Sequence, residues 1–275
     1  MKTFTFLVFA SLLFQSQISF SAIGAVSTAT GGSGRGAIDP VDGVLINPAV
    51  ISDFPDKNFS VNYSTDQYAL SIVDNGKDAY FPAALVFKSI KTDLIDTQQL
   101  GLTLATYRWK KFVVGTSLSM LDYTEHSVPA VEQRYKQATL DLGATMAVTS
   151  NFGLGLVFNK VTANKIALAE TEQVQQTAAL GMSYIFQGFA RFRFDVETAP
   201  ENKTQKLVYM AGLENFINDW VVVRLGYQNN TFLDKNYFTA GLGFSGPQFG
   251  LHYAYISNVS NKTEDQHLID LGIPF

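Results

Sequence analysis

The amino-acid sequence predicts an all-β protein, a transmembrane antiparallel β-barrel of about 14 strands. Three observations support this fold class. Apolar residues alternate with period two over most of the chain, aromatic residues flank the short links, and short links alternate with long ones. The composition agrees, because 47% of the residues are hydrophobic and only 16% are charged, whereas an average soluble domain has about 25% charged residues.

Charge and cysteine content exclude several classes of protein. The formal net charge is −4, so a basic surface for nucleic acid is not expected. The chain has 0 cysteines, which excludes disulfides and cysteine-ligated metal sites. No spacing typical of metal ligands or of a phosphate-binding loop is present, so we expect no metal and no cofactor.

Residues 1–21 have the pattern of a secretory signal peptide. Lys2 supplies the positive start, an apolar run spans 4–14, and Ser19 and Ser21 give small residues before the expected cleavage site. The run is shorter than the ~18 residues of a spanning helix. We therefore expect export and removal of this segment.

Residues 22–56 differ in composition from the rest of the chain and lack its period-two alternation. A glycine-rich stretch at 31–36 is followed by an apolar stretch at 44–51. Glycine favours a flexible leader, but a leader has no need of apolar residues. The lumen of a 14-stranded barrel is too wide for inward side chains to fill, since ~8 strands is the size that side chains close. A folded plug in the lumen is therefore the second interpretation.

Residues 57–275 are expected to form the barrel. Fourteen rows of alternating apolar residues follow one another, and 12 to 14 strands of ~9–11 residues fit this length. The rows begin at Phe59, Tyr68, Phe81, Leu100, Phe112, Ala138, Phe152, Ala178, Phe192, Leu207, Val221, Phe238, Phe249 and Ile269.

Link lengths and aromatic positions orient this barrel. Over the last ten strands every second link is very short, and the links between them are longer and polar. Trp109, Phe152, Phe189, Trp220 and Phe249 flank the short links. Tight periplasmic turns, longer external loops and interfacial aromatic rings are typical of outer-membrane barrels. We expect contact with outer-membrane lipids in a Gram-negative-type bacterium.

Charged residues occupy the inward faces of several predicted strands. Their side chains either hold a plug or steer a carboxylate head group, or they form an ion-paired network that fills a wet interior. These lumen charges are Arg191, Arg193, Asp195, Glu197 and Arg224.

The segment at 34–49 resembles the N-terminal hatch of the FadL-type outer-membrane transporters. The resemblance rests on Gly34-Arg35, Asp39 and the turn Asn47-Pro48-Ala49. It implies a 14-stranded barrel with a hatch in the lumen and a long-chain fatty acid or another hydrophobic ligand. Barrels of the PorV kind, which share this start more distantly, act in protein secretion.

Pro82 stands in the third apolar row, between Phe81 and Ala83. Proline removes a ladder hydrogen bond and favours edges or bulges. The resemblance implies a gap in the wall at this strand, through which a ligand leaves sideways. Alternatively, Pro82 begins the strand at its periplasmic end, where a missing donor costs little.

The last strand alternates up to a terminal Phe275, which resembles the signal read by the barrel assembly machinery. Catalysis is not expected, because no Gly-x-Ser-x-Gly elbow is present and no spacing joins a serine to the histidines.

Together these features predict an outer-membrane channel for passive uptake of small hydrophobic molecules such as long-chain fatty acids. A structural, assembly or secretion-associated barrel without transport, or a general porin for small solutes, remains an alternative.

Overall fold

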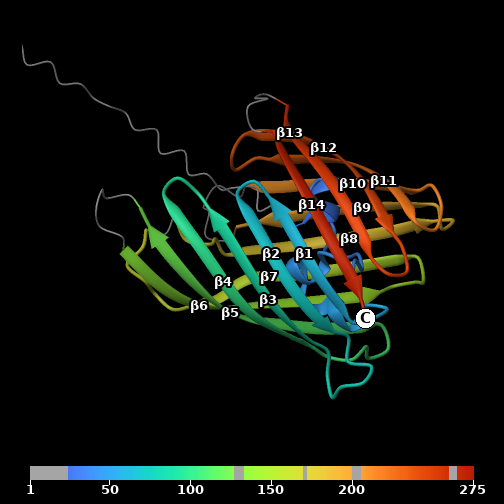
Figure 1. Cartoon of the computed structure of the whole chain (residues 1–275), viewed down its shortest axis with the longest axis horizontal. Helices are drawn as coiled ribbons and strands as arrows, with labels where there is room; N and C mark the ends of the chain where they lie inside the picture. Colours follow the sequence, from blue (N-terminus) through green and yellow to red (C-terminus); the bar gives the residue numbers. More distant parts are fainter. Residues whose placement is uncertain (1–23, 127–132, 170–171, 200–205, 260–264) are drawn as a thin grey trace, which may run out of the picture.

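Fourteen antiparallel strands in the described part of the chain close into a barrel (Figure 1). The computed structural model describes residues 24–126, 133–169, 172–199, 206–259 and 265–275. The strands are β1 Asn58–Ser64, β2 Gln67–Asp74, β3 Ala83–Lys91, β4 Ile95–Ala105, β5 Phe112–Glu125, β6 Gln133–Ala147, β7 Phe152–Ala163, β8 Thr177–Phe186, β9 Ala190–Thr198, β10 Leu207–Phe216, β11 Val221–Asn230, β12 Lys235–Ser245, β13 Gly250–Asn258 and β14 Gln266–Pro274.

The first and last strands close the barrel against each other. Val61 of β1 lies opposite Leu70 of β2 on one side and Leu271 of β14 on the other. Closure leaves no open sheet edge, which is the condition for strands to cross a bilayer. Each of the fourteen predicted rows falls on a strand, so the predicted fold class is confirmed at the upper end of the strand count.

Ten of the fourteen described strands begin at residues other than the first of their apolar row, and β3 and β4 illustrate the two directions. β3 begins at Ala83 and not at Phe81, because Pro82 between them has no N–H for the ladder. β4 begins at Ile95, five residues before Leu100. Residues 96–99, near the start of β4, are polar, so the apolar row does not extend to this end of the strand.

The outer face carries the apolar row of each strand. Leu100 is 59% exposed and Leu118 58% exposed, whereas Thr103 and Ser119 on the opposite face of the same strands are buried. Trp109 and Trp220 are exposed beside short links, and the Trp220 and Phe244 rings meet edge to face at 6.3 Å between centroids. This exterior is typical of a barrel that spans a membrane.

Three short helical elements precede the barrel: α1 Ala25–Ala29, α2 Gly43–Ile46 and the 3-10 helix η1 Pro48–Asp53. None of the helices within the described ranges has the length and apolar character needed to cross a membrane. Figure 1 shows this blue segment inside the ring of strands. We call residues 24–56 the hatch segment; residues 1–23, with the predicted signal peptide, lie outside the described residues.

The strands differ greatly in length around the barrel. β1 and β2 have 7 and 8 residues, whereas β5 and β6 have 14 and 15. The tall side has an apolar cluster of its own, in which Tyr123 and Leu121 pack with Leu168 from the β7–β8 link.

Candidate hatch and ligand path

The hatch segment is almost wholly buried by the inner face of the barrel. The residues of α1, Ala25–Ala29, are at or near zero exposure, and so are the residues Ala49–Ile51 of η1. α1 lies against β11–β14, and η1 lies against β4–β6. The segment therefore crosses the lumen from one side of the wall to the other.

Asn47 ties the hatch segment to itself and to the wall. Its Oδ1 accepts the Ala49 N–H at 3.0 Å, while its Nδ2 donates to the Arg35 carbonyl at 2.9 Å and to the Ala144 carbonyl of β6 at 3.2 Å. Asn47 also caps η1, and Pro48 occupies the first turn of η1, where a missing N–H costs nothing. The side chain of Asn47 therefore connects the start of η1, the Arg35 backbone and β6.

Arg35 joins the hatch segment to β9. Its Nη1 lies 3.1 Å from Asp195 Oδ2, and its Nη2 also contacts Glu197. Asp195 Oδ2 accepts the N–H groups of Gly34 and Arg35 as well, at 2.9 and 3.0 Å. Asp195 is fully buried, so its charge depends on these donors.

A second ion-pair network surrounds Glu214 of β10. Arg193 Nη2 lies 2.6 Å from Glu214 Oε1, Arg224 Nε lies 2.9 Å from Oε2, and Arg191 approaches Oε1 at 3.4 Å. Arg193 also reaches Asp39 of the hatch segment at 3.4 Å. The five predicted lumen charges therefore do face inward, and two of the predicted hatch residues, Arg35 and Asp39, pair with them.

Asp42 is a buried hatch carboxylate that the sequence pattern did not single out. Its Oδ2 accepts the Ser27 N–H at 2.7 Å, while Asp270 of β14 accepts the Ala25 N–H at the same end of α1. Burial, reinforced by the charge of Asp39, raises the pKa of Asp42 to about 6.

Lumen-facing glycines let the hatch backbone lie directly on the wall. A Cβ on Gly155 of β7 would overlap the Arg35 carbonyl, and a Cβ on Gly143 of β6 would overlap Asn47 and come within 2.7 Å of Pro48. On β11, a Cβ on Gly226 would meet the backbone of Thr30 and Gly31. Only residues without a side chain permit this approach.

The opposite side of the hatch segment packs through apolar side chains. We call this contact the apolar seam; it comprises Val44, Ala49, Val50, Ile51 and Phe54 of the hatch segment and Val73, Ala84, Val86, Ala105 and Val113 of β2–β5. At the end of the seam beside the β2–β3 and β4–β5 links, Arg108 Nε donates to Asp53 Oδ1 at 3.0 Å, and Asn75 Nδ2 donates to the Phe54 carbonyl at 3.0 Å.

Pro82 lies immediately before β3. β3 pairs without a register shift with β2 from Ala83 to Ile90 and with β4 from Ala83 to Lys91. The Pro82 carbonyl accepts the Ala105 N–H at 3.1 Å. This is the arrangement that the second interpretation of Pro82 expects. The wall has a register shift at another place, between Leu140 and Leu142 of β6.

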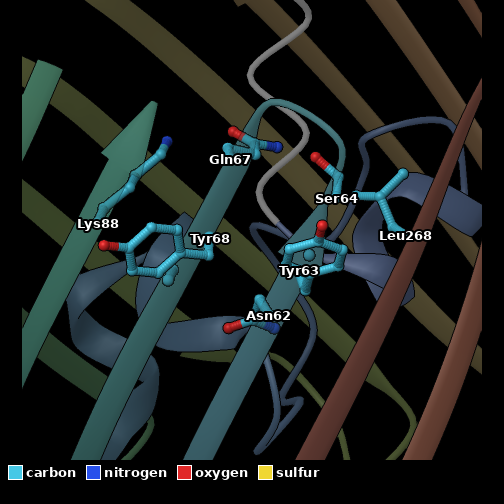
Figure 2. Close-up of a pocket in the computed structure, with 9 residues that line it drawn as sticks. Asn62, Tyr63, Ser64, Gln67, Tyr68, Lys88 and Leu268 are labelled. Atoms are coloured by element: carbon cyan, nitrogen blue, oxygen red, sulfur yellow. The ribbon is translucent and has the colours of Figure 1, made fainter. Parts of the chain in front are cut away.

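A small cavity lies where the β1–β2 hairpin meets β3 and β14. Figure 2 shows Asn62, Tyr63, Tyr68, Lys88 and Leu268 around it, and its volume is about 10 Å³. Ligand pockets measure about 300–1,000 Å³, so this cavity has room for a water molecule and not for an organic ligand.

No group of three or more metal-ligating side chains occurs within the described ranges. His252 contacts Arg224 at 3.2 Å, and His126 approaches Asp96 at 3.5 Å. Ser127, which follows His126, lies outside the described residues.

Only the comparison with solved structures finds similar proteins. No protein-family model and no curated protein matches this sequence. Among solved structures, the Ralstonia pickettii toluene transporter TbuX is similar with a TM-score of 0.68 and 13% identity, over 92% of this chain and 98% of that chain.

Two further structures share the architecture. The Pseudomonas putida toluene transporter TodX has a TM-score of 0.67 at 14% identity, over 92% of this chain and 98% of that chain. A Pseudomonas aeruginosa FadL homologue has a TM-score of 0.63 at 10% identity, over 90% and 97%. The chain therefore has the fold of the FadL-type outer-membrane channels.

Proposed function

We propose that the protein is an outer-membrane channel for the passive uptake of small hydrophobic molecules. One observation carries this proposal: the lumen of a wide barrel holds a segment that packs against one side of the wall through a cluster of alkyl and phenyl groups. The similar solved structures include two toluene transporters. Monoaromatic hydrocarbons and long-chain fatty acids are the ligand classes to test first.

Binding in such a channel would come mainly from burial of apolar surface, about 25 cal/mol per Å². A toluene-sized molecule has no charge to pair, so it needs only apolar wall. A fatty acid carboxylate would have to leave water or meet an arginine. The arginines of the lumen already pair with Asp195, Glu197 and Glu214, which favours uncharged ligands.

A structural or assembly barrel without transport is the second candidate function. The observation that favours it is the dense filling of the lumen, in which Arg193, Asp195 and Glu214 are each at most 2% exposed. The same filling argues against a general porin, which needs a continuous water path.

Two measurements decide among these functions. Cells whose outer membrane contains lipopolysaccharide would express the chain or an empty vector, and the initial uptake of radiolabelled toluene and oleate would be compared. Planar-bilayer conductance of the purified barrel would be measured beside it. Faster toluene uptake with negligible conductance supports the channel, steady ion conductance supports the porin, and neither signal supports the structural barrel.

A further inference from the structure

The β4–β5 link, residues 106–111, carries an unusual share of the positive charge at its end of the barrel. Arg108, Lys110 and Lys111 lie within it, whereas the links β6–β7, β8–β9, β10–β11 and β12–β13 at the same end contain no lysine or arginine. Arg108 pairs with Asp53 of η1. Neither lysine forms an ion pair with any residue that the structure describes. The described chain therefore leaves two positive charges of this link without a carboxylate.

A tight turn holds the two ammonium groups beside the outer wall. Trp109 and Phe112 exchange backbone hydrogen bonds of 2.8 and 3.0 Å, so Lys110 and Lys111 form the tip of the hairpin. Lys110 has a φ of 56°, a conformation that glycine and asparagine adopt more easily than lysine. Its Nζ lies 5.2 Å from the centre of the Trp109 ring, while Lys111 Nζ donates to the Val148 carbonyl at 2.7 Å. An ammonium group has three donors, so each lysine keeps donors for a further acceptor.

Exposed rings and alkyl side chains adjoin the two lysines. Trp109 is 70% exposed, and Tyr107 and Phe112 are exposed as well. Phe112 begins the outward row of β5, which continues with Val114 and Leu118. The lysines therefore lie where the lipid-facing band of the wall ends. In a membrane barrel this is the level of the lipid headgroups.

We propose that Trp109, Lys110 and Lys111 form a docking surface for the headgroup of an anionic glycerophospholipid. The two ammonium groups bind the phosphate oxygens, because lysine binds phosphate as a point charge. The Trp109 ring packs against the glycerol and the first carbons of the acyl chains, as amphipathic rings do at a membrane interface. Such a surface is independent of what the lumen transports.

The place of the link in the barrel favours a phospholipid over a lipopolysaccharide. Lys110 and Lys111 lie on a tight turn, and tight turns face the periplasm in outer-membrane barrels. The leaflet on that side consists of phospholipids, some of which carry a net negative charge. The attraction of lysines to such a leaflet acts within about a Debye length and weakens with salt.

The site contains its own fluorescent reporter, because the chain has two tryptophans. Trp220→Phe leaves Trp109 alone, and Trp109→Phe leaves Trp220, which is exposed on the β10–β11 link without lysine or arginine. The full chain of each variant would be reconstituted in phosphatidylcholine bilayers with increasing fractions of brominated phosphatidylglycerol. Bromine quenches tryptophan on contact, so quenching against lipid fraction gives the relative affinity of the two lipids at each position.

We expect at least a tenfold preference for phosphatidylglycerol at Trp109 and less than a twofold preference at Trp220. Each lysine at an anionic membrane surface contributes about fivefold in affinity, so two lysines predict roughly a 25-fold preference. In the Trp220→Phe background, Lys110→Gln/Lys111→Gln should lower the preference at Trp109 to the level of Trp220. Salt at 1 M should do the same without any substitution.

Lys91→Gln/Lys136→Gln is the matched control. It removes two exposed lysines from the opposite end of the strands, so the net charge changes equally while the β4–β5 link stays intact. The preference at Trp109 should remain unchanged. Heat-modifiable migration would verify that every variant is folded before its fluorescence is read.

Three outcomes would overturn the inference. Equal preferences at Trp109 and Trp220 would mean that the lysines select no lipid. A preference at Trp109 that survives Lys110→Gln/Lys111→Gln would assign it to other groups. Stronger displacement of brominated phosphatidylglycerol by lipid A than by unlabelled phosphatidylglycerol would place this surface in the lipopolysaccharide leaflet.

Discussion

Replacement of Arg35 by methionine tests how firmly the hatch segment is held. Methionine keeps the length of the side chain but removes the guanidinium that pairs with Asp195 and Glu197. Asp195 is fully buried and keeps two backbone donors, from Gly34 and from residue 35 itself. Glu197 is 22% exposed, so water can solvate part of its carboxylate when the guanidinium is gone.

Breaking a buried ion pair costs about 3–5 kcal/mol when one charge is left behind. The remaining N–H donors and the partial exposure of Glu197 place Arg35→Met at the lower end, roughly 3 kcal/mol. That value corresponds to roughly a 100-fold larger population of the detached segment, because 1.4 kcal/mol is about tenfold. Hydrogen exchange of the amides at 25–54, read by mass spectrometry, should speed up by that factor.

Lys136→Met is the matched control. Lys136 is 72% exposed and lies 3.9 Å from Asp122, and such surface pairs contribute little. Its loss should leave exchange of the hatch segment unchanged. The reasoning is refuted if the hatch segment of Arg35→Met exchanges at the parent rate. It is also refuted if the free-energy change in the double variant Arg35→Met/Asp195→Asn is as large as the sum of the changes in the two single variants.

Three further outcomes are expected. Gly155→Val should expel the hatch segment from its seat on β7 and make residues 25–54 sensitive to protease in the folded barrel, whereas Gly250→Ala, whose nearest new contact is 3.2 Å away, should not. The stability of the docked hatch should fall by ~3 kcal/mol at most as pH rises from about 4 to about 6, because the pKa of Asp42 is raised by burial from 3.8 to about 6; Asp42→Asn should flatten this slope in hydrogen exchange. Removal of Phe275, whose N–H donates to the Lys57 carbonyl at 3.0 Å, should lower the amount of heat-modifiable barrel in the outer membrane.

Period-two alternation was enough to predict the strands, because each lipid-facing row must be apolar while the lumen face is free to vary. The rule weakens where the bilayer ends. Residues 96–99 of β4 are polar on both faces and escaped the pattern, although they are paired in the ladder. The inward direction of Arg193 and Asp195 followed from the same alternation.

The partners of those charges could not be predicted. Asp195 meets Arg35 across 160 positions of sequence, and Arg193 meets Asp39 across 154. Periodicity states which face a residue occupies but not which segment lies opposite it inside a lumen. Gly153 and Gly155 of β7 have no room for a side chain because the hatch backbone passes over them, and the strand pattern does not contain that path. Asp42 carried no signal, because a single aspartate before a short helix is common at helix starts.

The direct connection between the hatch segment and β1 has a consequence for assembly. Only residues 54–57 separate η1 from β1, and β1 is one half of the closing pair with β14. The hatch segment also bonds to Thr239 of β12 and Asp270 of β14, strands that are synthesised last. The hatch segment therefore cannot complete its contacts until β12 and β14 have been synthesised. We expect the last step of insertion to be cooperative, with the pairing of β1 and β14 and the docking of the hatch segment occurring together.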